Sequence, residues 1–314
     1  MSLPTVRRLT LPIGVAVVVL TSLLVTARPA KSETGLEHVV GAITSTVAAQ
    51  LPANPKIWVP YTAPVTPDRC QDGSSSCIDT TIGIMTSRAN ALAPTCSHNA
   101  VFSVLYLRVT ERYREVAATP GYFSTPSNVN HEDAIFADLY FNAYDNWQSG
   151  NAQAVPPAWR LAFAAAQARQ LQGVGDALLG MIAHILRDLP FALWRISLGE
   201  RSDHLAINPM LRSVYEQVVG ELSRRFDPTI ITANLVPGTE GTLVVDALAQ
   251  WRDQAWNDAV DLVNAPDQQQ WNAVAQRVER NAWITALGVY LATKYPLQIT
   301  TVVRDAYCAT HWNT

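Results

Sequence analysis

The chain has 314 residues, of which 48% are hydrophobic and 16% are charged, and its formal net charge is −3. This composition is ordinary for a globular protein. No stripe of Lys and Arg is present, so the electrostatic footprint of a nucleic-acid-binding protein is missing and we expect no nucleic-acid partner.

The N-terminus has the order of a secretory signal peptide over residues 1–27. Arg7 and Arg8 precede an apolar run over residues 9–24, and small residues follow it. An uncleaved membrane anchor is the alternative, although the run is shorter than the roughly 20 residues that span a bilayer comfortably. We therefore expect a secreted or extracytoplasmic protein, attached to a membrane only if this segment stays uncleaved. About 287 residues (314 minus 27) remain after cleavage, which suits one domain.

The four cysteines are Cys70, Cys77, Cys96 and Cys308, and in an exported chain this even number predicts two disulfides. Of the three possible pairings we favour Cys70 with Cys77, a tight clip, and Cys96 with Cys308, which ties the N-terminal region to the C-terminal tail. Metal binding by these thiols is the minority alternative, because the interval between Cys70 and Cys77 is longer than the usual zinc spacing.

Two predicted parts follow the leader. Residues 28–96 form an N-terminal helix and a disulfide-pinned loop layer, because residues 51–96 are rich in Pro, Ser, Thr and Asp. Residues 97–314 form an all-α domain, since Ala, Leu, Gln, Arg and Trp recur at helical spacing. The predicted fold class is an all-α, single-domain helical bundle with a disulfide-pinned N-terminal loop layer. No Gly-rich phosphate loop and no Gly-x-Ser-x-Gly elbow occurs, which argues against mononucleotide-binding and serine-hydrolase folds.

Capping residues and prolines predict the helix boundaries within the all-α domain. Asn208 and Pro209 in particular have the pattern of an N-cap followed by a first-turn proline. The predicted helices cover residues 97–115, a segment that opens at 131–133, and residues 157–171, 208–226, 242–263 and 267–295.

An apolar helical segment over residues 180–190 concentrates ionisable side chains. His184 and Asp188 are four residues apart and therefore share one helix face. Pro190 removes one helical hydrogen bond and predicts a kink beside Asp188. Such a helix indicates a site in which His184 acts as a general base oriented by a carboxylate. The alternative is structural, because a buried His–Asp pair, or a pair between Asp188 and Arg195 or Arg187, satisfies buried polarity without chemistry.

Asp203 and His204 precede a predicted helix, so the chain can turn back and bring them opposite His184 and Asp188. These four side chains would form a zinc or manganese site, although their spacing matches no recognised metal signature. Asn208 is more typical of a helix cap than of a ligand.

His131, Glu132 and Asp133 form a third polar cluster, at the start of a predicted helix. Acidic residues commonly occupy first turns because they complement the helix dipole. We therefore interpret most of this cluster as structural and retain Asp133 as a candidate site residue.

Four stretches have the pattern of a known family: 99–110, 132–140, 157–163 with 179–189, and 201–208. On these stretches the chain resembles a bacterial family of helical proteins catalogued as a domain of unknown function, over roughly residues 97–260. The most specific pattern is Gly-Met-x-Ala-His-Ile-x-x-Asp-Leu with a later Asp-x4-Asn. The resemblance implies no known activity. The polar set that it implies as shared is Asp133, His184, Asp188, Asp203 and Asn208.

Ile182 and Leu186 stand where the family tends to have Asn, four residues apart on one helix face. If this face lines a pocket, the pocket is apolar and takes a hydrophobic ligand such as a lipid-like or polyketide-like molecule. If the face packs in the core, the two substitutions mean little.

Three functions are compatible with these residues. The first is an exported, metal-assisted hydrolase in which His184, Asp188 and Asp203 are catalytic and zinc or manganese activates water. The second is a metal-free acid–base cyclase or isomerase that acts on an apolar small molecule. The third is a secreted binding protein without catalysis. We expect a small-molecule or lipid-like ligand, and the candidate binding residues are Asp133, Arg195, Asn208, Ile182 and Leu186.

Overall fold

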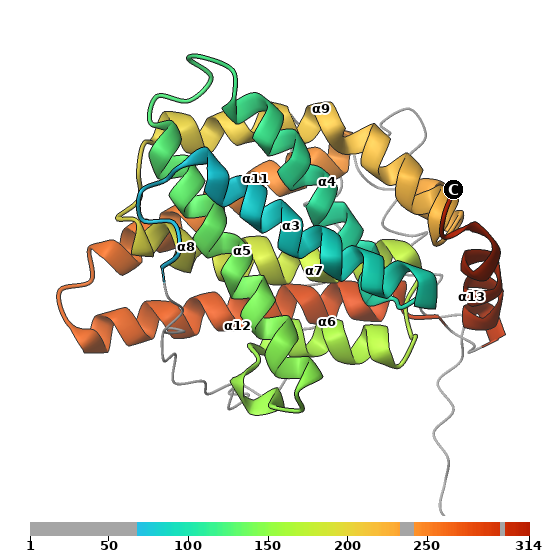
Figure 1. Ribbon diagram of the computed structural model, residues 1–314. Coiled ribbons are helices and arrows are strands. Elements are labelled where there is room, and N and C mark those ends of the chain that lie inside the picture. Colours follow the sequence, from blue (N-terminus) through green and yellow to red (C-terminus); the bar gives the residue numbers. More distant parts are fainter. Residues whose placement is uncertain (1–67, 233–241, 296–298) are drawn as a thin grey trace, which may run out of the picture. The chain divides into compact units, whose positions relative to one another are not determined.

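The computed structural model of the protein describes residues 68–232, 242–295 and 299–314, which belong to one compact unit (Figure 1). Throughout these residues the regular secondary structure is helical, so the predicted all-α class is confirmed. The predicted leader, residues 1–27, and residues 28–67 of the predicted N-terminal region lie outside the described residues.

Residues 75–92 form the helix α3 (Ser75–Leu92), so the loop layer predicted for this segment is wrong. Half of its residues are polar, but buried residues recur every three or four positions along one face. Ile78 and Met85 on that face are each 1% exposed. The face packs on α4 (Asn99–Ala117) and α5 (Pro126–Gln148). The segment forms a helix because one of its faces is buried against these neighbours. The prediction of a loop used only the amino-acid composition, which does not show how the apolar residues are spaced.

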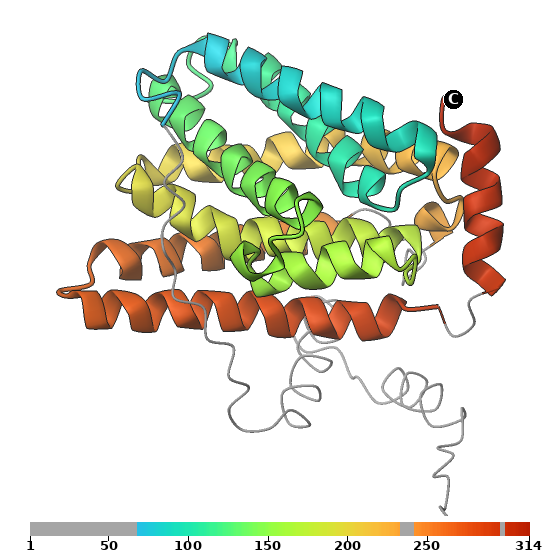
Figure 2. The ribbon, with the colours of Figure 1, turned by 60° about the horizontal axis from the view of Figure 1, so that its bottom comes forward.

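Most of the remaining helices lie close to their predicted bounds. Figure 2 shows them packed side by side, with α3 along the upper edge of the view. The helix α6 (Pro157–Gln167) begins with its first-turn proline, and α11 (Thr242–Val263) has the predicted bounds. Asp267 caps α12 (Gln268–Thr293), because its side chain accepts a hydrogen bond of 2.8 Å from the backbone N–H of Gln270. The other short or terminal elements are η1 (Ala93–Thr95), η2 (Ala152–Ala154), α10 (Thr229–Thr232) and α13 (Ile299–His311).

The helix α9 (Arg201–Arg225) begins before Asn208, so the predicted cap at Asn208 and Pro209 is wrong. Pro209 lies inside this helix and removes the hydrogen bond to the carbonyl of Leu205. Both residues are exposed, so water can replace the missing donor. The helix therefore continues through the proline and carries Asp203 in its first turn.

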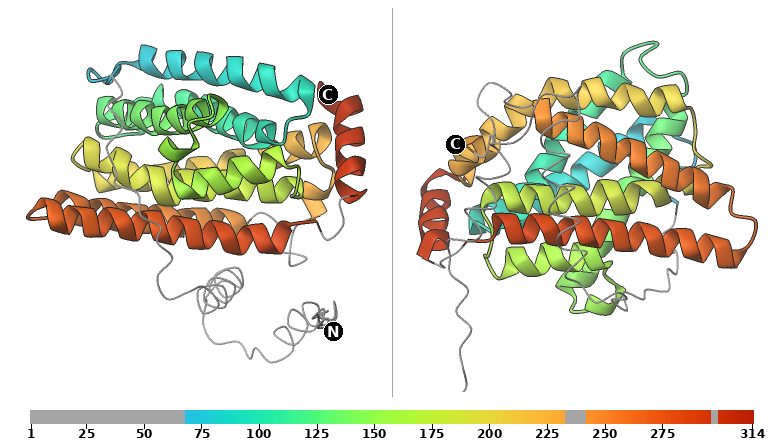
Figure 3. Two further views of the ribbon diagram at one scale, coloured as in Figure 1. Left: turned by 90° about the horizontal axis from the view of Figure 1, so that it is seen from below. Right: turned by 180° about the vertical axis from the view of Figure 1, so that it is seen from behind.

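The helical run Gly173–Arg195 is the core helix of this unit. It consists of α7 (Gly173–Ile182), the π-helical segment η3 (Ala183–Asp188) and α8 (Leu189–Arg195). The helices α4, α6, α11 and α12 pack against it, and α3 and α12 lie on opposite sides of it (Figure 3). Among the described residues it is the one helix long and apolar enough to cross a membrane, but 83% of its apolar window is buried within the protein.

A wider, π-helical turn precedes Pro190, the residue at which the sequence predicts a kink. Pro190 has no N–H to donate to the carbonyl of Leu186. In the turn before it, the N–H of Leu189 reaches the carbonyl of His184, five residues earlier. Such π-helical insertions are frequent at functional sites. Here the insertion contains both His184 and Asp188.

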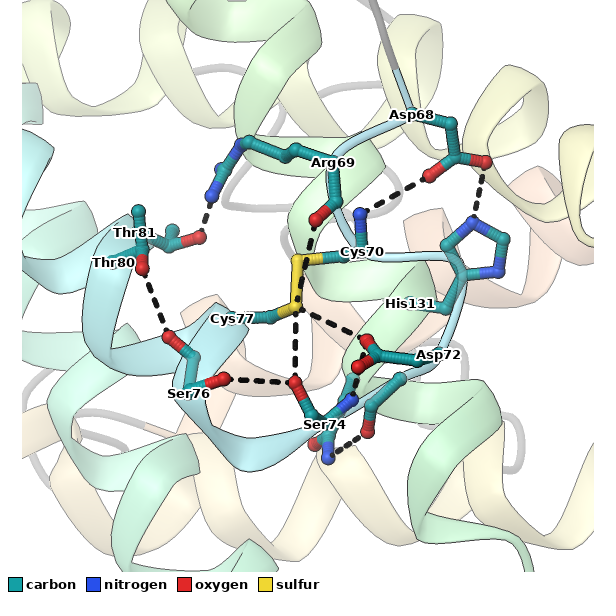
Figure 4. Close-up of a disulfide and its surroundings, with 12 residues drawn as sticks. Asp68, Arg69, Cys70, Asp72, Ser74, Ser76, Cys77, Thr80, Thr81 and His131 are labelled. Atoms are coloured by element: carbon teal, nitrogen blue, oxygen red, sulfur yellow. Dashed lines mark hydrogen bonds and ion pairs between the residues drawn. A yellow bond between two sulfur atoms is a disulfide. The ribbon is translucent and has the colours of Figure 1, made fainter.

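Both predicted disulfides, Cys70–Cys77 and Cys96–Cys308, are present. The first ties the loop before α3 to the first turn of that helix (Figure 4). Just before this loop, the Asp68 carboxylate lies 2.8 Å from Nε2 of His131 on α5. The second disulfide joins the end of η1 to α13 across 212 residues of sequence. Two disulfides indicate an oxidising environment.

Candidate functional site

His184 and Asp188 form a buried pair on η3. His184 Nδ1 and Asp188 Oδ2 are 3.0 Å apart, and the two residues are 3% and 0% exposed. Asp188 also accepts hydrogen bonds of 2.8 Å from Trp159 Nε1 and from Arg187 Nη1. Because Asp188 is the acceptor for all of these donors, the proton of the pair lies on His184 Nδ1. Nε2 then keeps its lone pair, as a general base requires. Burial lowers the pKa of His184, which favours this neutral imidazole.

A second buried ion pair supports the first. Arg187 Nε donates to Glu279 Oε1 at 2.9 Å, and Glu279 comes from α12. Burial raises the pKa of Glu279, although Arg187 opposes this shift. The chain of contacts from Glu279 through Arg187 and Asp188 to His184 thus joins α12 to η3 and holds the imidazole.

Aromatic rings from α4 and α5 fix the plane of the imidazole. The Phe136 ring stacks on His184 with 3.4 Å between centroids and 8° between planes, and the Tyr106 ring contacts it edge-on at 4.4 Å. Gly180, one turn before His184, makes room for Phe102, because a Cβ at Gly180 would lie 2.3 Å from the Phe102 ring. The position of Nε2 is therefore set by packing as well as by Asp188.

A cavity of about 170 Å³ lies beside His184, between α4, α5, α7, α9 and α11. Its walls are mostly apolar, and the apolar side chains that form them include Leu105, Val109, Met181, Ile185, Val214 and Leu248.

Four buried polar atoms on residues of this wall have no hydrogen-bond partner within the described part of the chain. They are His184 Nε2, Tyr106 Oη, Thr110 Oγ1 and Asp133 Oδ2. Buried polar atoms are normally paired, because an unpaired one costs roughly 1–3 kcal/mol. Four of them around one apolar cavity are typical of a site that a ligand completes.

Glu132 and Asp133 bring two carboxyl groups to the same wall. Burial raises the pKa of Glu132 to about 7. Burial, with the neighbouring Glu132 charge, also raises the pKa of Asp133 to about 7. A carboxyl group with this pKa can donate a proton near neutral pH. Both residues lie in the second turn of α5, which begins at Pro126, so the predicted first-turn role of this cluster is wrong.

Asp203 is not part of the His184 group. Its carboxylate accepts hydrogen bonds of 2.7 Å from the backbone N–H of Ser124 and of 2.8 Å from that of Thr125, just before α5. Burial alone would raise the pKa of Asp203, but these hydrogen bonds outweigh it and lower the pKa. Asp203 thus anchors the start of α5.

His204 is also engaged away from His184. Its Nε2 contacts the backbone oxygen of Arg252 at 3.1 Å, and its ring lies 5.0 Å from that of Trp256. Burial and the Arg252 charge lower the pKa of His204 to about 2. The four predicted metal ligands therefore fall into two separate places. In residues 68–232, 242–295 and 299–314, no group of three or more His, Cys, Asp or Glu side chains could hold a metal ion.

The other predicted binding residues, Asp133 apart, lie off the cavity wall. Ile182 and Leu186 are 0% and 7% exposed in the hydrophobic core, so the apolar face that they form does not shape the cavity. Arg195 ends α8. Asn208 reaches the wall only through Arg252, whose Nε donates to its side-chain oxygen at 3.0 Å.

Four further polar residues line the wall and were not predicted from the sequence: Tyr106, Thr110, Glu132 and Arg252. Tyr106 and Thr110 carry a detectable signal, because they are polar residues four positions apart on an apolar helix face that also contains Phe102. Arg252 carries none, since one arginine in a polar-rich helix is normally a surface residue.

The model of a family of unknown function (DUF5995) matches residues 78–293. No curated protein and no solved structure matches the chain.

Proposed function

The chain belongs to DUF5995, a family of unknown function. From the geometry of the site, we propose that the protein is an acid–base isomerase or cyclase that moves protons on a small apolar molecule. One observation carries the proposal. His184 Nε2, backed by Asp188 and left without a partner among the described residues, belongs to an apolar cavity wall that also bears a carboxyl group with a pKa of about 7.

In the proposed reaction His184 is the base and Asp133 is the acid. His184 Nε2 removes a proton from a carbon next to a carbonyl group, while the Asp133 carboxyl donates its proton to the carbonyl oxygen. His184 then returns its proton to a different carbon of the enol, and Asp133 recovers its own. The double bond has moved, and no other reactant is consumed.

Tyr106 supports the same step. Its hydroxyl is buried on the wall without a partner in the described structure, and burial and the Asp133 charge raise its pKa well above the ordinary value. It therefore stays protonated and can donate a hydrogen bond to the developing enolate oxygen, which a low-dielectric site strengthens.

The size of the cavity limits the substrate. An engineered cavity of about 150 Å³ with apolar walls binds benzene, and the cavity here has about 170 Å³. The proposed substrate is therefore a molecule of about one ring or a short chain, rather than a long lipid.

The metal-assisted hydrolase has less support. It requires Asp203 and His204 beside His184, and both side chains are committed to contacts elsewhere. The binding protein without catalysis explains the cavity but not the orientation of a neutral imidazole by a buried carboxylate. We therefore keep it as an outcome of the experiment.

The proposal also includes export. Residues 1–27 have the order of a signal peptide, and the two disulfides suit an oxidising compartment. The expected partner is a small molecule. No nucleic acid is expected, because the net charge is −3 and basic residues do not cluster.

Conversion of a β,γ-unsaturated cyclohexenone into its conjugated isomer tests the proposed reaction, with ultraviolet absorbance as the readout. We expect the purified protein to convert the ketone in the presence of a chelator. His184→Gln should lower the rate by roughly 10²–10⁴-fold, the usual contribution of a general base. His311→Gln, on α13 and away from the cavity, is the matched control.

Two results would overturn the proposal. One is an unchanged rate in His184→Gln. The other is a wild-type protein that binds the ketone but neither converts it nor exchanges its protons with deuterated solvent, which would support the binding protein.

A further inference from the structure

Arg252 places a buried positive charge on the cavity wall. It comes from α11, is 5% exposed and lines the cavity together with Glu132. Its Nε donates to the side-chain oxygen of Asn208 at 3.0 Å, and its Nη2 donates to the backbone oxygen of His204 at 2.7 Å. Both of these acceptors are uncharged.

No carboxylate forms an ion pair with Arg252 in the part of the chain that the structure describes. The other deeply buried arginines do have such partners, since Arg187 pairs with Glu279 at 2.9 Å and Arg304 pairs with Asp176 at 2.5 Å. A buried ion without a counter-charge is destabilising, because it has left water without gaining an opposite charge. Arg252 therefore has hydrogen-bond partners but lacks the negative counter-charge that a buried cation normally has.

The charges around Arg252 do not supply this partner. Burial, and to a smaller extent the nearby Arg201, lower the pKa of Arg252 to about 10, so it remains a cation at neutral pH. Glu132 is the carboxyl group whose charge acts on it most, but burial raises the pKa of Glu132 to about 7. Glu132 can therefore lose its charge by taking up a proton, whereas Arg252 keeps its own.

We propose that Arg252 binds a carboxylate of the ligand, so that the substrate of this cavity is a small apolar carboxylic acid. A guanidinium and a carboxylate match in shape and charge and can form two parallel hydrogen bonds. The apolar body of the acid would lie against the walls that Arg252 shares with His184. This inference rests on the proposed function and adds the substrate class.

A cationic ligand is the opposing case, because Glu132 and Asp133 line the same cavity. An ionised carboxyl pair would attract an amine. Each of these carboxyl groups can become neutral near pH 7, and Arg252 cannot. The permanent charge on the wall is thus the positive one.

Binding of three one-ring probes to the full chain tests the inference. The probes are phenylacetate, its uncharged amide phenylacetamide and the cation phenethylamine, measured by calorimetric titration near neutral pH at constant ionic strength. Phenylacetate should bind at least about tenfold more tightly than either of the others. A preference for phenethylamine, equal binding of phenylacetate and phenylacetamide, or no binding of phenylacetate would overturn the inference.

Asn208→Asp tests the role of Arg252 without removing it. The new carboxylate has nearly the size of the amide and would lie against Arg252 Nε, so it would compete with the carboxylate of the ligand. We expect the affinity for phenylacetate to fall about tenfold and that for phenylacetamide to stay the same. Arg252→Gln should give the same result, and if it does not fold Asn208→Asp still decides the question.

Arg212→Gln is the matched control, because Arg212 is exposed on α9 and pairs with Asp246 outside the cavity. It should leave all three affinities unchanged. A loss of phenylacetate affinity in this variant equal to that in Asn208→Asp would show a general charge effect and overturn the assignment to Arg252.

The two experiments test the ligand class and the proposed reaction independently. A preference for phenylacetate without conversion of the unsaturated ketone overturns the reaction and leaves the ligand class. Conversion of the ketone without that preference overturns the ligand class and leaves the reaction.

Discussion

The His184 imidazole lies flat on the Phe136 ring, with 3.4 Å between the centroids and 8° between the planes. Phe136 comes from α5 and His184 from η3, so the stack joins two elements. Asp188 fixes which nitrogen of His184 carries the proton, and Phe136 fixes the plane in which Nε2 lies. Both constraints are needed if Nε2 is to meet one carbon of a bound substrate.

Phe136→Leu should therefore slow conversion of the unsaturated ketone more than its effect on stability explains. We expect the free energy of unfolding to fall by about 1–2 kcal/mol and the rate to fall about tenfold. Urea unfolding and the absorbance assay measure the two effects. Phe123→Leu, at a buried phenylalanine in another cluster, should cost similar stability and leave the rate unchanged. Equal rates in both variants would contradict the positioning role of Phe136.

Asp188→Asn should destabilise the protein by about 3 kcal/mol, because the amide cannot accept from Trp159, His184 and Arg187 together and removes one of the two carboxylates that pair with Arg187. It should also move the proton of His184 from Nδ1 to Nε2, since the amide can donate to Nδ1. Urea unfolding and the nitrogen chemical shifts of the imidazole measure these changes. An unchanged tautomer would contradict the assignment of Nε2 as the base.

Asp133→Asn should change how stability depends on pH. Burial raises the pKa of Asp133 to about 7 in the folded protein, whereas an unfolded chain has an Asp pKa of about 3.9. The folded state thus binds this proton more tightly, and the stability that the proton contributes is full below the unfolded pKa and is lost as pH rises through about 7.

The asparagine variant has no such proton, so its stability relative to wild type should rise with pH, by up to about 1.4 kcal/mol per pH unit. Urea unfolding of both proteins in mildly acidic and mildly alkaline buffer measures the difference. Glu216→Gln, at an exposed carboxyl on α9, is the control. A constant difference between wild type and Asp133→Asn across this range would contradict the burial of Asp133.

The two disulfides should contribute unequally to stability. Cys96–Cys308 closes 212 residues of sequence and Cys70–Cys77 closes 7. In the chain-entropy account this difference is worth about 3 kcal/mol, because the longer loop restricts the unfolded chain more. Replacing Cys96 and Cys308 by Ala should therefore lower the unfolding free energy by more than replacing Cys70 and Cys77. The opposite order in urea unfolding would contradict this account.

Short stretches of sequence predicted the local features of this protein. The bounds of α11, the start of α12 next to Asp267, the His184–Asp188 pair and both disulfides were predicted. Family membership was predicted as well. A cap or a pair four residues apart depends on the backbone geometry of one segment, and that geometry repeats wherever a helix forms.

Two predictions, one from the composition of a segment and one from the position of a single proline, were wrong. Residues 75–92 have many polar residues and still form a helix, because one face is buried against α4 and α5. Pro209 lies within α9 because its missing hydrogen bond falls on the exposed side. In both cases the environment outside the segment decides the outcome.

The candidate site could be predicted only in part. His184, Asp188 and Asp133 were found from the chain, but Tyr106, Thr110 and Arg252 join them through packing of α4 and α11. Asp203 and His204 were predicted beside His184 and lie with Ser124 and Arg252 instead.

The sequence by itself determined most of the helices, the disulfides and the buried His–Asp pair, because each rests on spacing within a segment or on a few covalent partners. The tertiary structure alone decided which polar groups share the cavity. Which helices meet depends on many weak apolar contacts spread over the whole chain, and no single residue or spacing encodes their sum.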